Sequence, residues 1–234
     1  MAGPASTART RTLPPSAAAH GRRSSGNQAA EYIRKLIFDG DLRPGERVPQ
    51  DRIAEVLSLS RIPVREGLIA LEREGWVTIE LNRGAFVNAL DADAVRDSYE
   101  LYGLIYGFAI RRAVTRADDT LLARLSEIET EMRSTDDPDR FWGLTLAFHS
   151  AIVEASRSPR IKVMLRASSG LVSGNFFEKI PGSIEVERRG TTAIVKALRK
   201  GNNDRAADAY ADMMHRQGER VVKTFHARGL FDTP

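Results

Sequence analysis

The feature that most constrains the fold is the order in which the spacing of apolar residues changes along the chain. Residues 27–74 place apolar side chains three and four positions apart, which is the period of helices. Residues 76–87 then alternate apolar and polar side chains around a Leu-Asn-Arg-Gly turn, as in a β-hairpin. Residues 91–228 return to helical spacing with almost no β-rich run. This order predicts a mainly α protein, in which three short helices and a hairpin precede a long all-helical part.

The long helical part divides at clusters of Asp, Ser, Pro and Gly, residues that start or end helices. We therefore expect a C-terminal all-α helical bundle of about six helices, near residues 91–116, 118–134, 138–156, 159–177, 184–200 and 203–227.

The chain thus divides into three predicted parts. Residues 1–26 are rich in Ala, Ser, Thr, Pro and Arg without an apolar period, and we expect a disordered basic tail that is either inert or touches phosphate loosely. Residues 27–90 hold the three helices and the hairpin, the arrangement of an N-terminal winged helix-turn-helix DNA-binding domain. Residues 91–231 form the helical bundle.

Composition excludes several classes of protein. The 234 residues include no cysteine, which rules out disulfides, thiolate zinc fingers, iron–sulfur clusters and cysteine nucleophiles. No apolar run approaches the roughly 20 residues that span a bilayer, and residues 1–20 lack the apolar core of a secretory signal. We therefore expect a cytoplasmic protein without a membrane partner. The net charge of +4 is a mild bias towards polyanions.

The segment from Ser60 to Leu68 is the strongest indication of function. Arg61 and Arg65 lie four positions apart, so they project from one face of a helix near its N-terminus. Arginine offers a planar fork that fits guanine and phosphate oxygens, and Ser60 with the free N–H groups of the first helical turn can hold a phosphate. The alternative is a solvated helix face with two ordinary arginines. The hairpin that follows favours a recognition helix for double-stranded DNA.

The hairpin turn carries a second candidate contact. Gly84 permits a left-handed backbone there, and Arg83 lies at the tip, where it can enter a minor groove or meet a phosphate. A generic turn with a solvated arginine is the alternative, and the preceding helix favours DNA contact.

These residues, taken together, resemble the DNA-binding domain of the GntR family of bacterial transcription regulators. The matching stretches are Leu42 to Val48, Ala54 to Leu57, Ser60 to Glu66, Leu71 to Val77 and Arg83 to Val87. The resemblance implies DNA contacts at Ser60, Arg61, Arg65, Arg83 and Gly84. The family's basic residue ahead of the second helix is displaced here by one position, to Arg52, which we include among the candidate contacts.

The helical part is similar to the C-terminal domain, of the FCD type, of the FadR-like subfamily. The similarity lies in Phe148-His149, Ala155-Ser156, Pro159 and a later Ile194-x-x-Ala197-Leu198-x-x-Gly201 stretch. It implies a homodimer and a small-molecule effector, which in the family is often an organic acid. Residues 91–231 would then be the effector-binding and dimerisation domain.

Many members of this family bind a metal through one Asp and three His, and this chain departs from that pattern. It keeps His149, but Thr145 and Thr191 stand at two of the other positions. The last position falls near Met213 or Met214, and His215 is displaced along the helix. We therefore predict no metal and no cofactor.

The resemblance places an effector cavity among six residues, Tyr102, Tyr106, His149, Arg166, Asn175 and Thr191. His149 is either a hydrogen-bonded core histidine or a donor to the effector, and the two tyrosines are either core or lining. A lining with few charges favours an effector that is larger or less anionic than a small carboxylate.

Nothing in the sequence predicts an enzyme. The chain has no Gly-x-Ser-x-Gly, phosphate-binding loop or Gly-x-Gly-x-x-Gly motif, so we assign no catalytic residue. We expect a transcription regulator, a repressor, whose affinity for its operator is controlled by an effector. The alternatives are a DNA-binding protein without an effector, and a metal-dependent sensor or enzyme built on the bundle.

Overall fold

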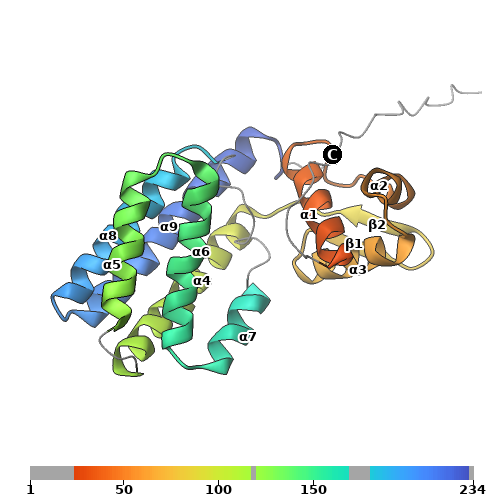
Figure 1. Cartoon of the computed structure of the whole chain (residues 1–234). Helices are drawn as coiled ribbons and strands as arrows, with labels where there is room; N and C mark the ends of the chain where they lie inside the picture. The colour runs from red at the N-terminus through yellow and green to blue at the C-terminus, as the bar shows by residue number, and fades with distance from the viewer. Residues whose placement is uncertain (1–23, 117–119, 169–179, 232–234) are drawn as a thin grey trace, which may run out of the picture.

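A computed structural model describes residues 24–116, 120–168 and 180–231 of the chain. Figure 1 shows two parts, a small one with the hairpin and a larger one made of helices alone. The small part contains α1 (Ser25–Phe38), α2 (Gln50–Leu57), α3 (Arg61–Arg73), β1 (Val77–Glu80) and β2 (Gly84–Val87). The larger part contains α4 (Ala92–Arg116), α5 (Thr120–Ser134), α6 (Pro138–Ala155), α7 (Pro159–Ser168), α8 (Ser183–Arg199) and α9 (Asn203–Ala227).

The small part is a winged helix-turn-helix whose core lies between α1 and α3. Val64, Leu68 and Leu71 recur at helical spacing on α3, and all three are buried. Gly67 permits a close approach of the two helices, because a Cβ there would lie 2.8 Å from the carbonyl oxygen of Gly26. The strands β1 and β2 pair antiparallel, with Val77 opposite Val87. The opposite side of α3 does not pack into this core and is exposed to solvent.

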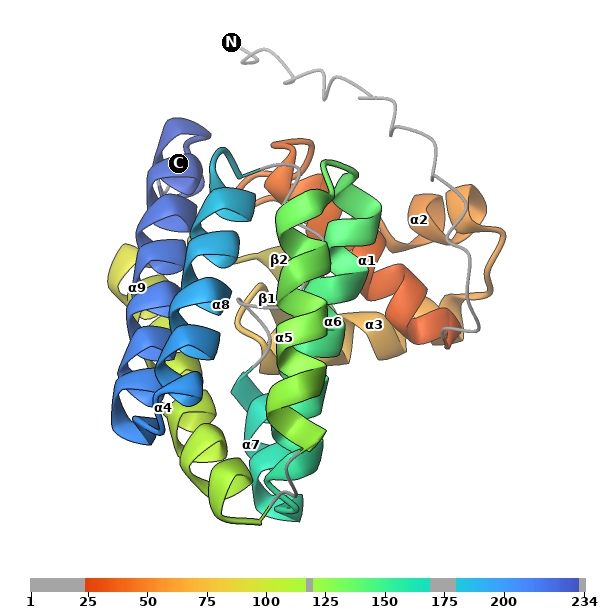
Figure 2. The same ribbon diagram turned by 60° about the vertical axis from the view of Figure 1, so that its left-hand side comes forward.

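The larger part is a helical bundle in which α4 and α9 are the longest helices. Figure 2 shows α9 packed alongside α4 and α8, with α5 and α6 beside each other. Gly103 of α4 lets α9 approach, because a Cβ there would lie 3.1 Å from the Cα of Ala211. The helix α7 packs against α4.

The C-terminal end of α9 joins the two parts. The Phe225 ring lies 5.5 Å from the Phe38 ring and 6.3 Å from the Trp76 ring, both edge-on. Arg228 donates to the carbonyl oxygen of Phe38 at 2.9 Å, and its guanidinium lies 4.1 Å from the centre of that ring. Leu90 donates its N–H to the carbonyl oxygen of Leu230 at 3.3 Å. The last turn of α9 is therefore part of the winged helix core.

The mainly α architecture and the helical bundle were predicted correctly, and two boundaries differ. The helix α1 begins at Ser25, because the Ser24 hydroxyl accepts from the N–H of Asn27 and caps it. The expected tail therefore extended too far at residues 24–26, while residues 1–23 lie outside the described residues. The helix expected over 159–177 is described only as far as Ser168.

Across the parts of the chain that the structure describes, we find no helix with both the length and the apolar character needed to cross a bilayer.

Candidate DNA-reading surface and effector cavity

The helix α3 presents both predicted arginines to solvent. Arg61 and Arg65 are exposed at the N-terminal end of α3, while Val64 between them is fully buried. Ser60 occupies the N-cap position with an extended backbone, but its hydroxyl makes no capping hydrogen bond. That hydroxyl and the open first turn of α3 are available to a phosphate oxygen.

Arg61 has a partner that the sequence did not indicate. Its Nε lies 2.8 Å from Oδ1 of Asp51 on α2, and both side chains remain largely exposed. A carboxylate that holds Nε leaves the two terminal amino groups of the guanidinium free. These two groups can still form the fork that recognises guanine.

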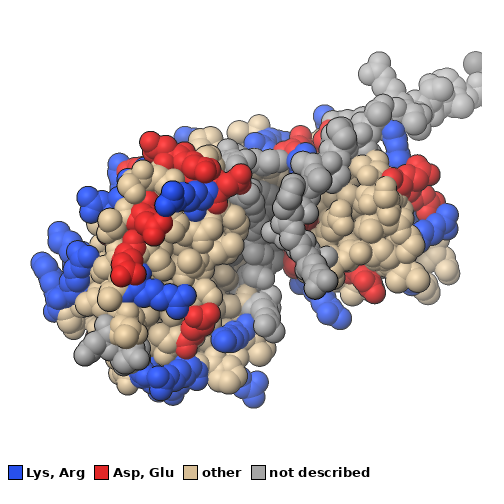
Figure 3. Space-filling model, viewed as in Figure 1, with Lys and Arg blue, Asp and Glu red and all other residues tan. Residues whose placement is uncertain are grey.

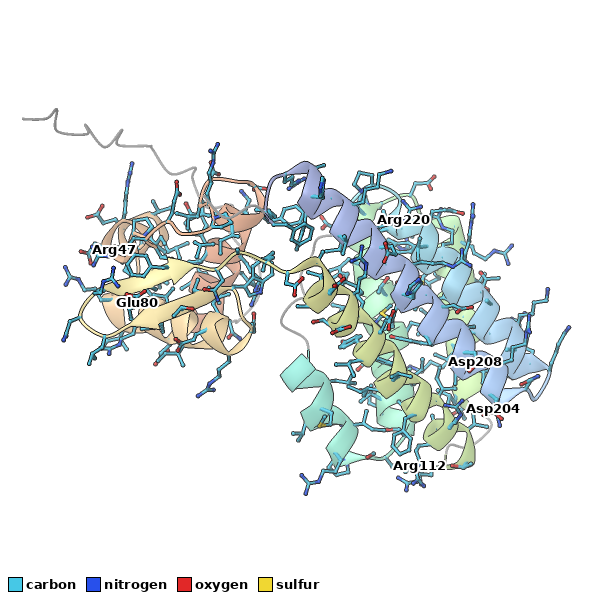
Figure 4. All side chains as sticks on the ribbon, turned by 180° about the vertical axis from the view of Figure 1, so that it is seen from behind. Arg47, Glu80, Arg112, Asp204, Asp208 and Arg220 are labelled. Carbon is cyan, nitrogen blue, oxygen red and sulfur yellow. The ribbon has the colours of Figure 1, made fainter. Side chains whose placement is uncertain are left out.

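The tip of the hairpin carries Arg83, which is exposed and forms an ion pair with Glu80. Gly84 has a φ of +113°, and a Cβ there would lie 2.7 Å from Nε of Arg47. The left-handed backbone therefore favours glycine here, whereas the exposed Arg47 side chain could move away from a Cβ. Figure 4 labels Arg47 and Glu80 beside the hairpin. Arg47 is exposed, and sequence reasoning missed this second cation at the wing.

Arg52 is less exposed than the other arginines that are candidates for DNA contact. It is half-buried on α2, and its charge acts on Tyr32 of α1. Burial, followed by the charge of Asp41, raises the pKa of the Tyr32 phenol, and Arg52 opposes that rise. Contact between Arg52 and DNA stays a prediction.

The helical bundle presents charges of both signs, in contrast to a single basic face. Figure 3 shows Lys and Arg intermixed with Asp and Glu over the side of the bundle in view. An extended phosphate-binding surface would need one sign of charge, and the face of the bundle in this view does not have it.

A cavity of about 370 Å³ lies in the helical part, between α4, α6 and α7. This is the size of a small-molecule site. Its lining is mixed in polarity and consists of Tyr102, Tyr106, Leu146, His149, Ser150, Val153, Glu154, Lys162 and Leu165.

Three of the six predicted effector contacts, Tyr102, Tyr106 and His149, come together in this cavity. Thr191 is fully buried outside the lining, and its hydroxyl donates to the carbonyl oxygen of Glu187 at 2.9 Å. The side chain of Arg166 and the whole of Asn175 lie outside what the structure describes.

His149 is held by a buried carboxylate. Its Nε2 lies 2.9 Å from Oε1 of Glu187, whose side chain is completely buried on α8. Gln217 of α9 donates to Oε2 of Glu187 at 3.3 Å and to the carbonyl oxygen of Ser183 at 3.0 Å. Sequence reasoning missed Glu187, although it lies four residues before Thr191 and so shares a helix face with it.

The residues at the family's metal positions do not fit a metal. Thr145 and Thr191 offer neutral hydroxyls, and Met213 offers a thioether, in place of the carboxylate and imidazoles that bind Zn or Ni. His215 is exposed on the outside of α9, with Nδ1 at 3.1 Å from Glu100. Within residues 24–116, 120–168 and 180–231, no three His, Cys, Asp or Glu side chains gather into a metal-binding group.

Two family models match the chain. The model of bacterial regulatory proteins of the gntR family matches residues 26–87, and the FCD domain model matches residues 97–216. The second match alone covers half of the chain.

Curated relatives are regulators of transcription. The chain is 30% identical over 151 residues to an uncharacterised HTH-type transcriptional regulator of Mycobacterium tuberculosis, covering 64% of this chain and 62% of the relative. It is 33% identical to the Nta operon transcriptional regulator of Aminobacter aminovorans, covering 54% and 61%. It is 30% identical to the gluconate operon transcriptional repressor of Bacillus subtilis, covering 56% and 55%. The matched region thus spans about three fifths of these relatives.

Solved structures share the fold. Escherichia coli McbR/YncC matches with a TM-score of 0.61 at 20% identity, covering 87% of this chain and 99% of the other. A GntR family member from Pseudomonas syringae matches with a TM-score of 0.51 at 21% identity, covering 87% and 86%.

Proposed function

Because the chain belongs to the GntR family of bacterial regulatory proteins and carries an FCD domain, we propose that it is a homodimeric repressor controlled by a small molecule. As a member of this family it is a transcriptional regulator and not an enzyme. The observation that carries the DNA-binding part of the proposal is the exposed pair Arg61 and Arg65 at the N-terminal end of α3, whose other face is packed into the core. The name of one relative, a gluconate operon repressor, favours repression.

In the proposed complex, α3 enters the major groove with its N-terminal end first. Arg61 and Arg65 contact base edges, and Ser60 holds a phosphate. Arg83 and Gly84 bring the wing to the adjacent backbone or minor groove. Arg52 is the weakest member of this set, because its charge lies next to Tyr32 on α1.

A homodimer is supported by an apolar stripe on α4. Leu101, Leu104 and Phe108 are 55%, 64% and 48% exposed, and their spacing places them on one helix face. Monomeric proteins rarely expose such a contiguous stripe.

The same stripe is self-complementary. If two copies of α4 cross antiparallel with the two-fold axis between Leu104 and Ile105, Leu101 faces Phe108 of the other copy, and Asp97 faces Arg112. Figure 4 shows Arg112 towards the end of α4 that lies far from the winged helix domain. An isologous interface needs this kind of pairing, in which one patch serves both copies.

Control of DNA binding by the effector is supported by the path of α9. This helix places Tyr210 against Tyr106 and His149, both of which line the cavity, and ends in the winged helix core at Phe225. A ligand can shift the equilibrium only if it binds one arrangement of the two DNA-binding domains better than the other.

The test is operator binding by the full-length protein. An operator is first selected from random duplexes, and its affinity is then measured by gel shift. Arg61→Ala and Arg65→Ala should each weaken binding by about 1–3 kcal/mol if the contact to a base is bidentate. Arg73→Ala, at the opposite end of α3, is the matched control and should bind normally. Unchanged affinity in both test variants would overturn the assignment of α3.

A further inference from the structure

The inner end of the cavity is built from aromatic rings. Tyr106 stacks on Tyr210 with ring centres 4.5 Å apart and an interplanar angle of 9°. Tyr102 lies 5.1 Å from Tyr106, and the His149 ring lies 5.2 Å from Tyr106 and 5.5 Å from Tyr210. Tyrosine faces carry the negative part of the ring quadrupole, so they attract cations and not anions.

The buried charge beside these rings is a carboxylate. Glu187 has no solvent exposure, whereas the charged residues of the lining, Glu154 and Lys162, are exposed at the rim. Glu154 already forms an ion pair with Arg124 at 3.3 Å. Burial chiefly, with Glu187 contributing, raises the pKa of the Tyr102 phenol. The inner end therefore lies in the field of a negative group.

The hydrogen-bonding groups at this end include an acceptor on His149. A carboxylate oxygen of Glu187 can only accept from His149 Nε2, so in the neutral ring the proton is on Nε2 and Nδ1 is an acceptor. Deeper in the bundle and outside the cavity lining, three side-chain atoms of the described residues are buried without a hydrogen-bond partner: Oε1 of Gln217 and the hydroxyls of Thr145 and Tyr210.

We propose that this cavity takes a small organic cation, a primary amine whose ammonium group lies among the tyrosine rings and donates to His149. The inference rests on the proposed function, since it names the class of effector. An ammonium group balances the charge of Glu187, while a carboxylate would place a second anion beside it. The cavity volume of about 370 Å³ limits the ligand to a compact molecule.

The experiment compares amines and carboxylates that carry the same hydrocarbon group on the ammonium or the carboxylate. The probes are butylamine and pentanoate, phenethylamine and 3-phenylpropionate, and tryptamine and indole-3-propionate. The melting temperature of the full-length protein is measured at increasing concentrations of each probe. We expect at least one amine to raise the melting temperature in a saturable way, and its matched carboxylate to leave it unchanged.

Two variants locate the effect. Glu187→Gln keeps the shape of the side chain and should lower the affinity of the stabilising amine about tenfold, because the buried negative charge is removed. Tyr102→Leu removes a half-buried aromatic ring from the cavity lining and should also lower the affinity of the amine. This second variant still tests the inference if Glu187→Gln fails to fold. Glu131→Gln changes an exposed glutamate on α5 that does not line the cavity, so it is the matched control and should bind the amine normally.

Operator binding in the same samples separates this inference from the function on which it rests. If carboxylates stabilise the protein and release the operator, control by an effector stands and the amine class is wrong. If an amine stabilises the protein but leaves operator affinity unchanged, the amine class stands and control by this effector is wrong. If no amine raises the melting temperature, or if Glu187→Gln binds the amine as tightly as the natural protein, the inference is overturned.

Discussion

Asp51 illustrates how a single residue can act on DNA recognition without touching DNA. An exposed ion pair such as that between Asp51 and Arg61 contributes little to folding, typically below about 1 kcal/mol. In the proposed complex its effect lies in orientation, because the carboxylate holds Nε of Arg61 and leaves the two terminal guanidinium nitrogens to contact DNA. A fixed fork loses less freedom when it pairs with guanine than a mobile side chain does.

We therefore expect Asp51→Ala to reduce specificity while raising overall affinity. Loss of the carboxylate raises the net charge by one, so binding to random DNA should tighten. It also releases Arg61, so the preference for operator over random DNA should fall about threefold or more. Competition between operator and scrambled duplexes at one salt concentration measures the ratio. Glu55→Ala, an exposed acid on the same helix, makes the same charge change. An equal loss of preference in both variants would mean that net charge, and not orientation, is responsible.

At the scale of elements, α9 is the connection between the two parts of the molecule. It begins in the helical bundle, passes the tyrosine cluster at Tyr210 and ends against Phe38 and Trp76. A continuous helix transmits a displacement along its axis because its backbone hydrogen bonds resist bending. Under the proposed control by an effector, the contact at Phe225 both stabilises the fold and transmits the signal.

Phe225→Ala should destabilise the protein by about 3–5 kcal/mol, since the fully buried ring leaves a cavity between α1 and α9. Denaturant unfolding, followed by tryptophan fluorescence, measures the loss. His226→Ala changes the adjacent, exposed residue and should stay within about 0.5 kcal/mol of the natural protein. A small effect of Phe225→Ala would show that the winged helix domain is stable without α9.

The helices and strands were predictable from sequence because the spacing of apolar residues indicates which face of each element is buried. Val64, Leu68 and Leu71 repeat at helical intervals, and Pro or Gly residues stand at the ends of several helices. The chemistry of the cavity was not predictable, because a glutamate on an amphipathic helix is normally solvated. Glu187 is buried only because α6 and α9 bring His149 and Gln217 to it, and no local pattern encodes that meeting.

At the scale of the whole molecule, the proposed interface on α4 would determine how many copies bind one operator. Two linked DNA-binding domains bind a pair of half-sites far more tightly than one domain does, because the second contact is made within the complex. Dimerisation therefore belongs to the binding mechanism and is not only an aid to stability.

Leu104→Asp should convert the dimer to a monomer, because the two-fold axis would bring two carboxylates together in an apolar contact. Light scattering after size exclusion should show half the mass of the natural protein, and operator binding should weaken in parallel. Leu81→Asp alters a leucine that is 88% exposed at the wing and should leave the mass unchanged. A Leu104→Asp variant that keeps the full mass would place the interface elsewhere.

The position of Phe225 against Phe38 and Trp76 also has a consequence for folding during synthesis. A ribosome releases Phe38 and Trp76 early, but the ring that covers them comes nearly 150 residues after Trp76. At roughly 5–20 residues per second, the apolar surface of the nascent N-terminal domain stays uncovered for several seconds or longer. During that interval a chaperone can reach this surface, so the core of the winged helix part is complete only when α9 has emerged.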